Sequence, residues 1–310
     1  MSQLSTTLSC RLLCACGCAY YIDPVTGRYA PAPGDRFGPA IGYATTPTPI
    51  SGGDDGIDAC LVGENADGIV VAFRDTLPLS WQSWPTVLDW LQDLFCEPES
   101  RPNLPGKVHT GFYDATSSVI TEVAATVKSL NPTGTRPVYV TGHSLGGAMA
   151  ALGAWLLQAA SGIKVAQVVT FAAPKPGDGD FQAAYQKAFT NHLRYENYDD
   201  LVPLLPPADE FIKLVAEIPL IGELFKQAKS WNYQTVGALS YIENAADGYK
   251  VVSDSDGLMA ERLGNVVIEL GEDIYNENFS SFGNAHSVLC GYGYMSGTCP
   301  AAVCQGAQAA

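Results

Sequence analysis

The chain has 310 residues, of which 47% are hydrophobic and 16% are charged, so it holds enough apolar material for a full-size core. Its 17 basic and 32 acidic side chains give a formal net charge of −15, and no cluster of Lys or Arg interrupts the acidic excess. Nucleic-acid-binding surfaces are basic, and anionic membrane surfaces repel such a charge. No apolar run reaches the roughly 18 residues of a membrane-spanning helix. The composition therefore argues against nucleic acid as a partner and against a transmembrane segment.

The first apolar stretch, residues 12–22, lacks the features of a secretion signal. It contains three cysteines and Gly17, residues 1–9 carry no Lys or Arg, and no convincing small-residue cleavage site follows. We predict a structural helix here, with processing as the open alternative. On this ground we expect a cytoplasmic or leaderless protein, and the compartment stays open.

Nine cysteines cannot all pair within one chain. Cys10, Cys14 and Cys18 fall on one face of a helix, where cysteine packs as a small hydrophobic residue. The alternative is a soft metal site on the local Cys-x-Cys-x-Cys run, but a second cluster of ligands is missing. We therefore expect no metal and no cofactor. Cys299 and Cys304 could bridge, and the sequence leaves the pairing open.

The following residues alternate between strand-like and helical patterns. Residues 23–58 are rich in Pro and Gly and predict a loop with short edge strands. Runs of β-branched and apolar residues predict buried strands at 68–73, 137–141 and 164–171. Apolar residues at helical spacing predict helices within 119–130 and 145–160. This order predicts a mostly parallel sheet with helices on both faces, and no linker divides the single domain of residues 1–310.

A candidate nucleophile lies between the second of these strands and the helix that follows. Residues 142–146, Gly-His-Ser-Leu-Gly, fit the G-x-S-x-G pattern of a nucleophile elbow. Small residues at both ends allow the tight turn that exposes the Ser144 hydroxyl beside the N-terminus of a helix, where negative charge is stabilised. The alternative is a glycine-rich turn without chemistry.

Five stretches in the same order resemble motifs of the class 3 (fungal-type) lipases. They lie at residues 71–76 (V-x-F-R-G-[ST]), 90–93 (W-x-x-D), 108–112 (V-H-x-G-F), 138–147 (the elbow) and 200–207 (D-x-V-P-x-x-P-P). The resemblance implies an α/β-hydrolase fold with a lid over the active site. It also implies a Ser-His-Asp triad that cleaves lipophilic carboxylic esters.

The order of the chain narrows the choice of base, because in α/β-hydrolases an acid and then a histidine follow the nucleophile. Only His192 and His286 follow Ser144. His192 begins a predicted strand and so lies at the edge of the sheet opposite the catalytic one. We therefore predict that His286, in a loop, is the general base. His109 and His143 are expected to be structural hydrogen-bonding residues.

The acid follows the predicted strand over 192–197. Asp200 lies at the same sheet edge as the nucleophile, with Asp199 as its immediate rival and Asp178 and Asp180 as weaker ones. The resemblance favours Asp200, whose expected role is to hold the tautomer of the catalytic histidine.

Two backbone N–H groups are expected to stabilise the oxyanion. One belongs to Leu145, next to the nucleophile. The resemblance assigns the other to Thr76, whose hydroxyl Asp93 could orient. Asp75 stands where the family usually has Gly, and we expect its carboxylate to turn away from the hole.

Residues 77–98 follow the oxyanion segment, in the place of a lipase lid. An apolar stripe at helical spacing is interpreted as interfacial, and it comprises Trp81, Trp84, Val87 and Leu88. For Trp90, Leu91 and Leu94 we favour packing in the core. A second apolar stretch, about 208–230, predicts a helical insertion that either walls an acyl pocket or caps the core.

The sequence thus predicts a serine ester hydrolase, a triacylglycerol lipase or carboxylesterase. A phospholipase A1, a feruloyl esterase or an acyltransferase would use the same triad. An inactive binding module is the alternative from another class, and Asp75 keeps it open. The expected partner is a lipophilic ester at a lipid–water interface, and a monomer is expected. Secretion is suggested by the resemblance alone.

Overall fold

The computed structural model describes residues 6–53, 56–74, 94–207, 211–213, 231–245, 248–255, 257–276, 280–295 and 299. Within these ranges, eight strands form one sheet in the order β1-β2-β3-β4-β5-β7-β9-β10. Their bounds are β1 Thr48–Gly52, β2 Asp58–Glu64, β3 Ile69–Arg74, β4 Val138–His143, β5 Val165–Phe171, β7 His192–Asn197, β9 Ala238–Ala245 and β10 Gly248–Ser253. The short strands β6 (Gly177–Asp178) and β8 (Tyr233–Gln234) pair separately.

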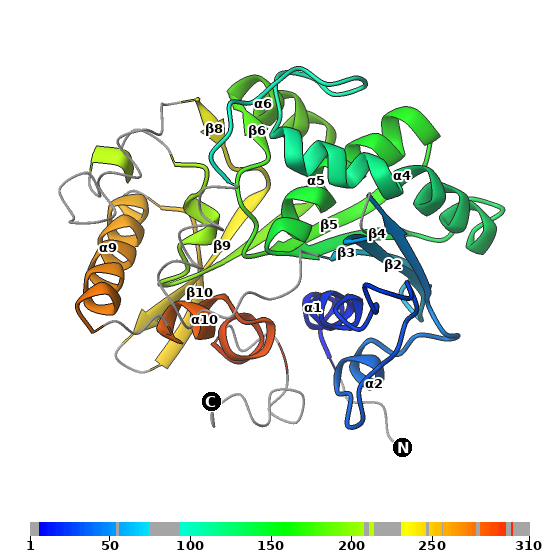
Figure 1. Cartoon of the computed structure of the whole chain (residues 1–310), viewed down its shortest axis with the longest axis horizontal. Helices are drawn as coiled ribbons and strands as arrows, with labels where there is room; N and C mark the ends of the chain where they lie inside the picture. Colours follow the sequence, from blue (N-terminus) through cyan, green and yellow to red (C-terminus); the bar gives the residue numbers. More distant parts are fainter. Residues whose placement is uncertain are drawn as a thin grey trace.

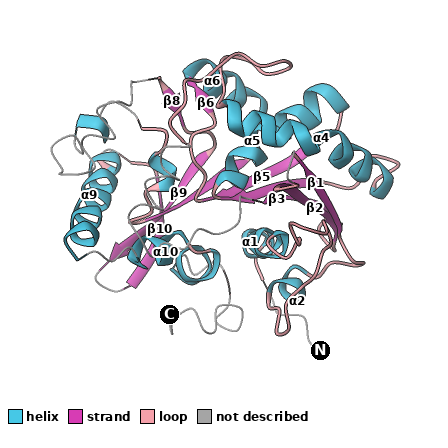
Figure 2. Ribbon diagram, in the orientation of Figure 1, coloured by secondary structure: helices cyan, strands magenta, loops and turns pink. Residues whose placement is uncertain are grey.

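Helices cover both faces of the sheet (Figure 1 and Figure 2). On one face lie α4 (Thr110–Leu130), α5 (Leu145–Ser161) and α6 (Gly179–Ala188). On the other lie α1 (Leu8–Ala19), α2 (Phe37–Ile41) and α10 (Ser280–His286), while α9 (Leu258–Asn276) lies toward the β10 end. The 3₁₀ turn η1 (Val202–Leu204) follows β7, and the π-helix η2 (Val288–Met295) follows α10.

The centre of the sheet, from β3 through β4, β5 and β7 to β9, is parallel. The predicted mostly parallel sheet is therefore confirmed. Both margins are antiparallel, where β1 and β2 precede β3 and where β10 follows β9. The strand β2 was missed because it offers only a short apolar run. A tight turn joins it to β3, in which the Asn65 side chain accepts the N–H groups of Asp67 and Gly68.

Alternating side chains of the buried strands divide the interior into two cores. On β3, the side chains of Ile69, Val71 and Phe73 pack with α4 and α5. The intervening Val70 and Ala72 pack with α1 and α2. Because both faces are covered, the strand is apolar throughout, which explains the continuous run in the sequence.

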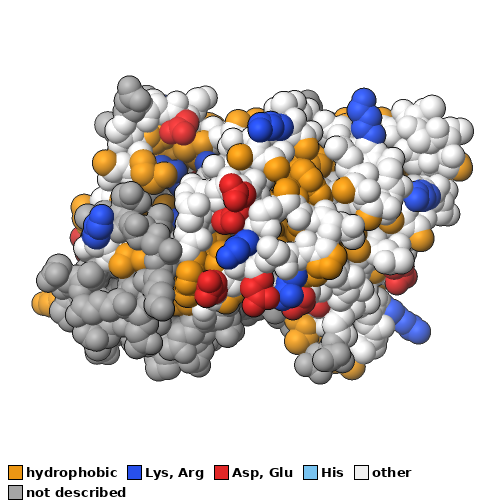
Figure 3. All heavy atoms as spheres, turned by 90° about the horizontal axis from the view of Figure 1, so that it is seen from above, with side chains coloured by type: hydrophobic (Ala, Val, Ile, Leu, Met, Phe, Trp, Pro, Cys, Tyr) orange, Lys and Arg blue, Asp and Glu red, His pale blue; other side chains and the backbone are white. Residues whose placement is uncertain are grey.

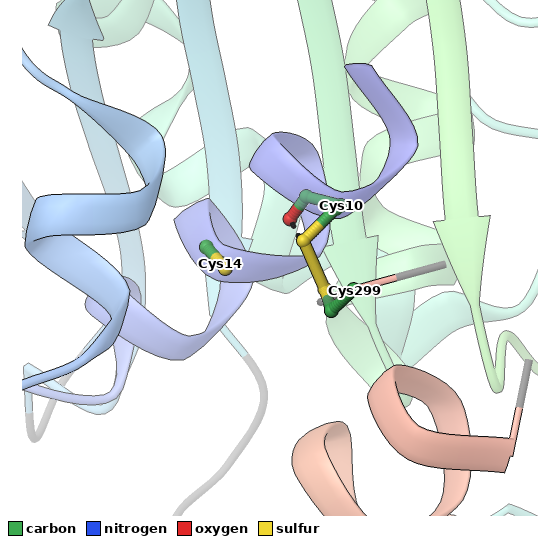
Figure 4. A group of neighbouring side chains, drawn as sticks. All are labelled: Cys10, Cys14 and Cys299. Atoms are coloured by element: carbon green, nitrogen blue, oxygen red, sulfur yellow. Dashed lines mark hydrogen bonds between the residues drawn. A yellow bond between two sulfur atoms is a disulfide. The ribbon is translucent and has the colours of Figure 1, made fainter. Parts of the chain in front are cut away.

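Helix α1 is a buried structural helix, as predicted, and nine of its twelve residues are buried. It packs against β3, β4 and η2. A disulfide joins its Cys10 to Cys299, so the expectation that Cys10 packs as a thiol is wrong (Figure 4). Cys299 is therefore not bridged to Cys304, the pairing that the sequence left open. The sequence could not indicate the pairing of Cys10 with Cys299 because 289 residues separate the two cysteines.

Two features of the structure bear on the predictions from composition: the distribution of charge on its surface and the length of its apolar helices. Figure 3 views the face of α4, α5 and α6, where Lys and Arg side chains are spread among Asp and Glu. None of the described helices is long and apolar enough to cross a membrane.

Most of the predicted lid, 77–98, lies outside the described residues, as does the insertion at about 208–230 apart from 211–213. Both remain predictions, and so does the single-domain organisation. Leu94 is described, and it is buried in the core beside α4 and α5, as expected.

Candidate active site

Ser144 occupies a strained turn between β4 and α5. Its backbone has φ 56° and ψ −134°, a conformation that non-glycine residues rarely adopt. The turn is too tight for a side chain at Gly142, because a Cβ there would lie 1.9 Å from the carbonyl oxygen of Gly146. At Gly147 a Cβ would lie 2.6 Å from the Cβ of Ala173. The elbow geometry predicted from G-x-S-x-G is thus present in the structure.

A chain of hydrogen bonds connects Ser144, His286 and Asp200. The Ser144 Oγ lies 2.8 Å from His286 Nε2, and His286 Nδ1 lies 3.1 and 3.0 Å from the two carboxylate oxygens of Asp200. All three side chains are buried. The hydroxyl can donate to Nε2 while the Nδ1–H donates to the carboxylate, which is the arrangement that general-base activation of serine requires.

His286 is the last residue of α10, so its predicted position in a loop is wrong. Residues 280–286, Ser-Ser-Phe-Gly-Asn-Ala-His, include poor helix formers and show no apolar periodicity. The sequence pattern therefore predicts a loop. The helix gains its stability from tertiary contacts. One of these is the Asn197 Nδ2–H bond to the carbonyl of Ala285, at 2.8 Å, directly before the histidine.

Asp200 is held by groups that the sequence analysis did not identify. The hydroxyl of Tyr292 donates to its Oδ2 at 2.6 Å, and the Val202 N–H donates to its Oδ1 at 3.0 Å. The Tyr292 oxygen also accepts the backbone N–H of Asn197, at 3.1 Å. Tyr292 is completely buried within η2, six residues after the histidine. The apolar residues next to Tyr292 in the sequence predict core packing, so the pattern gives no signal that its hydroxyl bonds the catalytic acid.

Replacing Tyr292 by phenylalanine should lower kcat/KM for ester hydrolysis about tenfold, because one hydrogen bond to a buried carboxylate is lost. KM should change little, because the hydrogen bond that is lost goes to Asp200, behind the catalytic histidine. Tyr185→Phe is a matched control, because the buried Tyr185 hydroxyl has no hydrogen-bond partner among the described residues. Equal activity in both variants would contradict this role for Tyr292.

Asp199, the rival acid, has a different environment. Both oxygens that face His286 belong to Asp200. Burial raises the pKa of Asp199 to about 7, and the negative charges of Glu269, Asp200 and Asp273 add to the shift. Asp199 is therefore partly protonated near neutral pH.

Asp199→Asn should change how stability depends on pH. The folded chain keeps the Asp199 proton up to about pH 7, whereas an aspartate of ordinary pKa 3.8 loses it earlier. Between these values the folded state binds more protons, so this group lowers the free energy of unfolding as pH rises. Urea unfolding should show a gain for the asparagine variant that is small at pH 4, grows with pH and levels off above pH 7. A gain independent of pH would contradict this assignment.

His143 is a structural neighbour of the catalytic histidine, as predicted. Its Nε2–H donates to the backbone carbonyl of His286 at 2.6 Å, and its Nδ1 accepts from the Tyr20 hydroxyl at 3.1 Å. Burial holds the pKa of His143 well below its usual value, and the nearby His286 adds to this effect. A neutral His143 therefore supports the base without adding a competing charge.

The other acids and histidines named from the sequence lie elsewhere. Asp178 caps α6, and Asp180 lies in the first turn of that helix. His109 caps α4. His192 begins β7 and hydrogen-bonds the Thr170 hydroxyl at 3.0 Å, and burial lowers its pKa to about 3.

Of the two residues predicted to form the oxyanion hole, Leu145 lies within the described residues and Thr76 does not. Leu145 is the first residue of α5, where backbone N–H groups lack partners within the helix. Residues 75–93 lie outside the described ranges. The oxyanion role of Leu145 and the roles of Thr76, Asp75 and Asp93 therefore remain predictions. The same holds for the interfacial role of the stripe that comprises Trp81, Trp84, Val87 and Leu88.

Comparison with known proteins agrees with these features. Residues 78–210 match the family model described as lipase (class 3). The resemblance to the class 3 lipases is confirmed. The chain is 35% identical over 159 residues to the lipase of Rhizomucor miehei, a match that covers 47% of this chain and 39% of that protein. The chain thus spans less than half the length of this curated relative.

Two solved structures show the same α/β-hydrolase fold. MDLA from Penicillium cyclopium, solved as a mutant, superposes with a TM-score of 0.62 at 18% identity, over 97% of this chain and 100% of that one. A triacylglycerol lipase whose catalytic centre is described as a serine protease triad gives a TM-score of 0.59 at 20% identity, over 94% and 96%. At these identities the likeness establishes the fold alone, and the fold prediction is confirmed.

Proposed function

We propose that this chain is a carboxylic ester hydrolase in which Ser144, His286 and Asp200 form the catalytic triad. The observation that carries the proposal is the position of His286, between the serine hydroxyl at 2.8 Å and the carboxylate at 3.0 Å. The elbow and the class 3 lipase match support it further.

The reaction proceeds through an acyl-enzyme. His286 Nε2 takes the proton of Ser144 as Oγ attacks the ester carbonyl, and then gives it to the departing alcohol. Asp200 stabilises the imidazolium and keeps its own charge. The N–H of Leu145, together with that of Thr76, binds the oxyanion, and such donors contribute several kcal/mol. His286 then deprotonates a water molecule that attacks the acyl carbonyl. The bond to Ser144 Oγ breaks, the proton returns to this oxygen, and the carboxylic acid is released.

The substrate class in this proposal is a lipophilic ester, met at a lipid–water interface by a monomeric enzyme. The family match over residues 78–210 supports it, because that region includes the predicted lid. The net charge of −15 favours neutral acylglycerols over anionic phospholipids, since a strongly acidic protein repels an anionic surface.

A series of p-nitrophenyl esters from acetyl to palmitoyl, measured below and above their solubility limits, tests this function. We expect hydrolysis whose kcat/KM rises with acyl length, and a faster rate on emulsified triacylglycerol than on phospholipid vesicles. Preference for the acetyl ester would contradict the lipophilic substrate, and preference for phospholipid would favour a phospholipase. Failure to cleave any ester would contradict the hydrolase itself.

A further inference from the structure

Three cysteine sulfurs meet on the side of the sheet opposite α4 and α5. The sulfurs of Cys10, Cys14 and Cys299 all lie within 4.8 Å of one another, and all three residues are buried. Figure 4 shows Cys14 on the same helix as Cys10, beside the disulfide to Cys299. In the described part of the chain, this is the one group of three His, Cys, Asp or Glu residues whose ligand atoms all lie this close together.

Two parts of the chain bring these sulfurs together. Cys10 and Cys14 lie one helical turn apart on α1, and a helix directs positions i and i+4 to the same side. Cys299 comes from the segment after η2, and its backbone N–H bonds the carbonyl of Gly293 at 3.4 Å. Because α1 packs against β3, β4 and η2, the pair on the helix is held in place before any ligand binds.

The donor set selects a particular class of ion. Three sulfurs without a carboxylate or an imidazole suit thiophilic ions such as Zn²⁺, Cd²⁺ or Cu⁺, and do not suit Mg²⁺ or Ca²⁺. Thiolates at the usual Zn–S distance of about 2.3 Å stand roughly 4 Å apart around one ion. Cys14 already lies within 4.8 Å of the other two sulfurs, and the sulfurs of Cys10 and Cys299 must move apart to this spacing once the disulfide is open.

We propose that Cys10, Cys14 and Cys299 form a two-state site, a disulfide beside a thiol when oxidised and a three-thiolate site for one thiophilic ion when reduced. A phosphine or dithiol reductant supplies the two electrons that open the S–S bond, and the two sulfurs take up two protons. The thiophilic ion then displaces the protons of all three thiols, which are released to solvent, and forms three metal–sulfur bonds. The ion thereby replaces the disulfide as the link between α1 and the segment after η2.

Cadmium titration of the full chain tests the site without any ester substrate. The protein is reduced with a phosphine, desalted without oxygen and titrated with Cd²⁺ while the sulfur-to-cadmium charge-transfer absorption is recorded. We expect tight uptake by the reduced chain, a higher Tm on binding, and no uptake at these cysteines by the oxidised chain. Cys14→Ser should weaken the tight step at least about tenfold, because one of three ligands is lost.

Cys16→Ser is the matched control. Cys16 is buried on the same helix, but its sulfur lies 3.3 Å from the Thr141 hydroxyl and outside the trio. This variant should bind Cd²⁺ as tightly as the wild type. If Cys14→Ser does not fold, as judged by circular dichroism, Cys14→Ala takes its place. The proposal is wrong if the reduced wild type takes up no Cd²⁺, or if the Cys14 variants bind it as tightly as the wild type.

Discussion

Replacing Ser144 by alanine should lower kcat/KM for ester hydrolysis by about 10⁴-fold or more, because the covalent step of the proposed mechanism is then impossible. KM should change far less, since the substrate-binding surface is retained. The steady-state rate on a p-nitrophenyl ester, compared with the rate without protein, measures the loss.

Ser118→Ala is the control for this experiment. Ser118 is exposed on α4, and its hydroxyl bonds Asp58 and the carbonyl of Ala115, away from the candidate site. Its replacement should leave the rate near that of the wild type. Substantial esterase activity in folded Ser144→Ala protein would mean that another nucleophile acts.

Asp200→Asn should lower kcat by about 10³- to 10⁴-fold, through a different cause. The carboxylate accepts the Nδ1–H of His286, whereas an amide can present an N–H group to that nitrogen and thereby stabilise the wrong tautomer. The hydrogen bonds from Tyr292 and Val202 compete for the remaining acceptor oxygen. The variant should still fold, because the asparagine has nearly the same volume.

Asp199→Asn is the matched control one residue away, and it also decides between the two acids that the sequence offered. It should keep kcat within a few-fold of the wild type, because both carboxylate oxygens that bond His286 Nδ1 belong to Asp200. A greater loss in Asp199→Asn than in Asp200→Asn would reverse the assignment.

The centre of the fold was predictable because its signals are local. Continuous β-branched runs mark β3, β4 and β5, which are buried on both faces, and Gly142 marks a turn where backbone atoms approach closely. The ordered motifs indicated Ser144, Asp200 and His286, which the structure brings within hydrogen-bond distance.

Features that depend on distant contacts could not be predicted. The helix that ends at His286 is stabilised by the Asn197 bond to Ala285, 88 residues away along the chain. Tyr292 reaches Asp200 only because η2 packs against the end of β7. The Cys10–Cys299 disulfide joins the first and last parts of the described chain, and nothing in either local sequence indicates its partner.

Covalent labelling with a fluorophosphonate examines the nucleophile without reference to any particular ester. Intact-mass analysis should show one adduct per chain, and peptide mapping should place it on Ser144, with no adduct in Ser144→Ala and with much slower labelling in Asp200→Asn. An adduct on a different serine, or unlabelled wild-type protein that still hydrolyses esters, would contradict the central role of the hydroxyl beside His286.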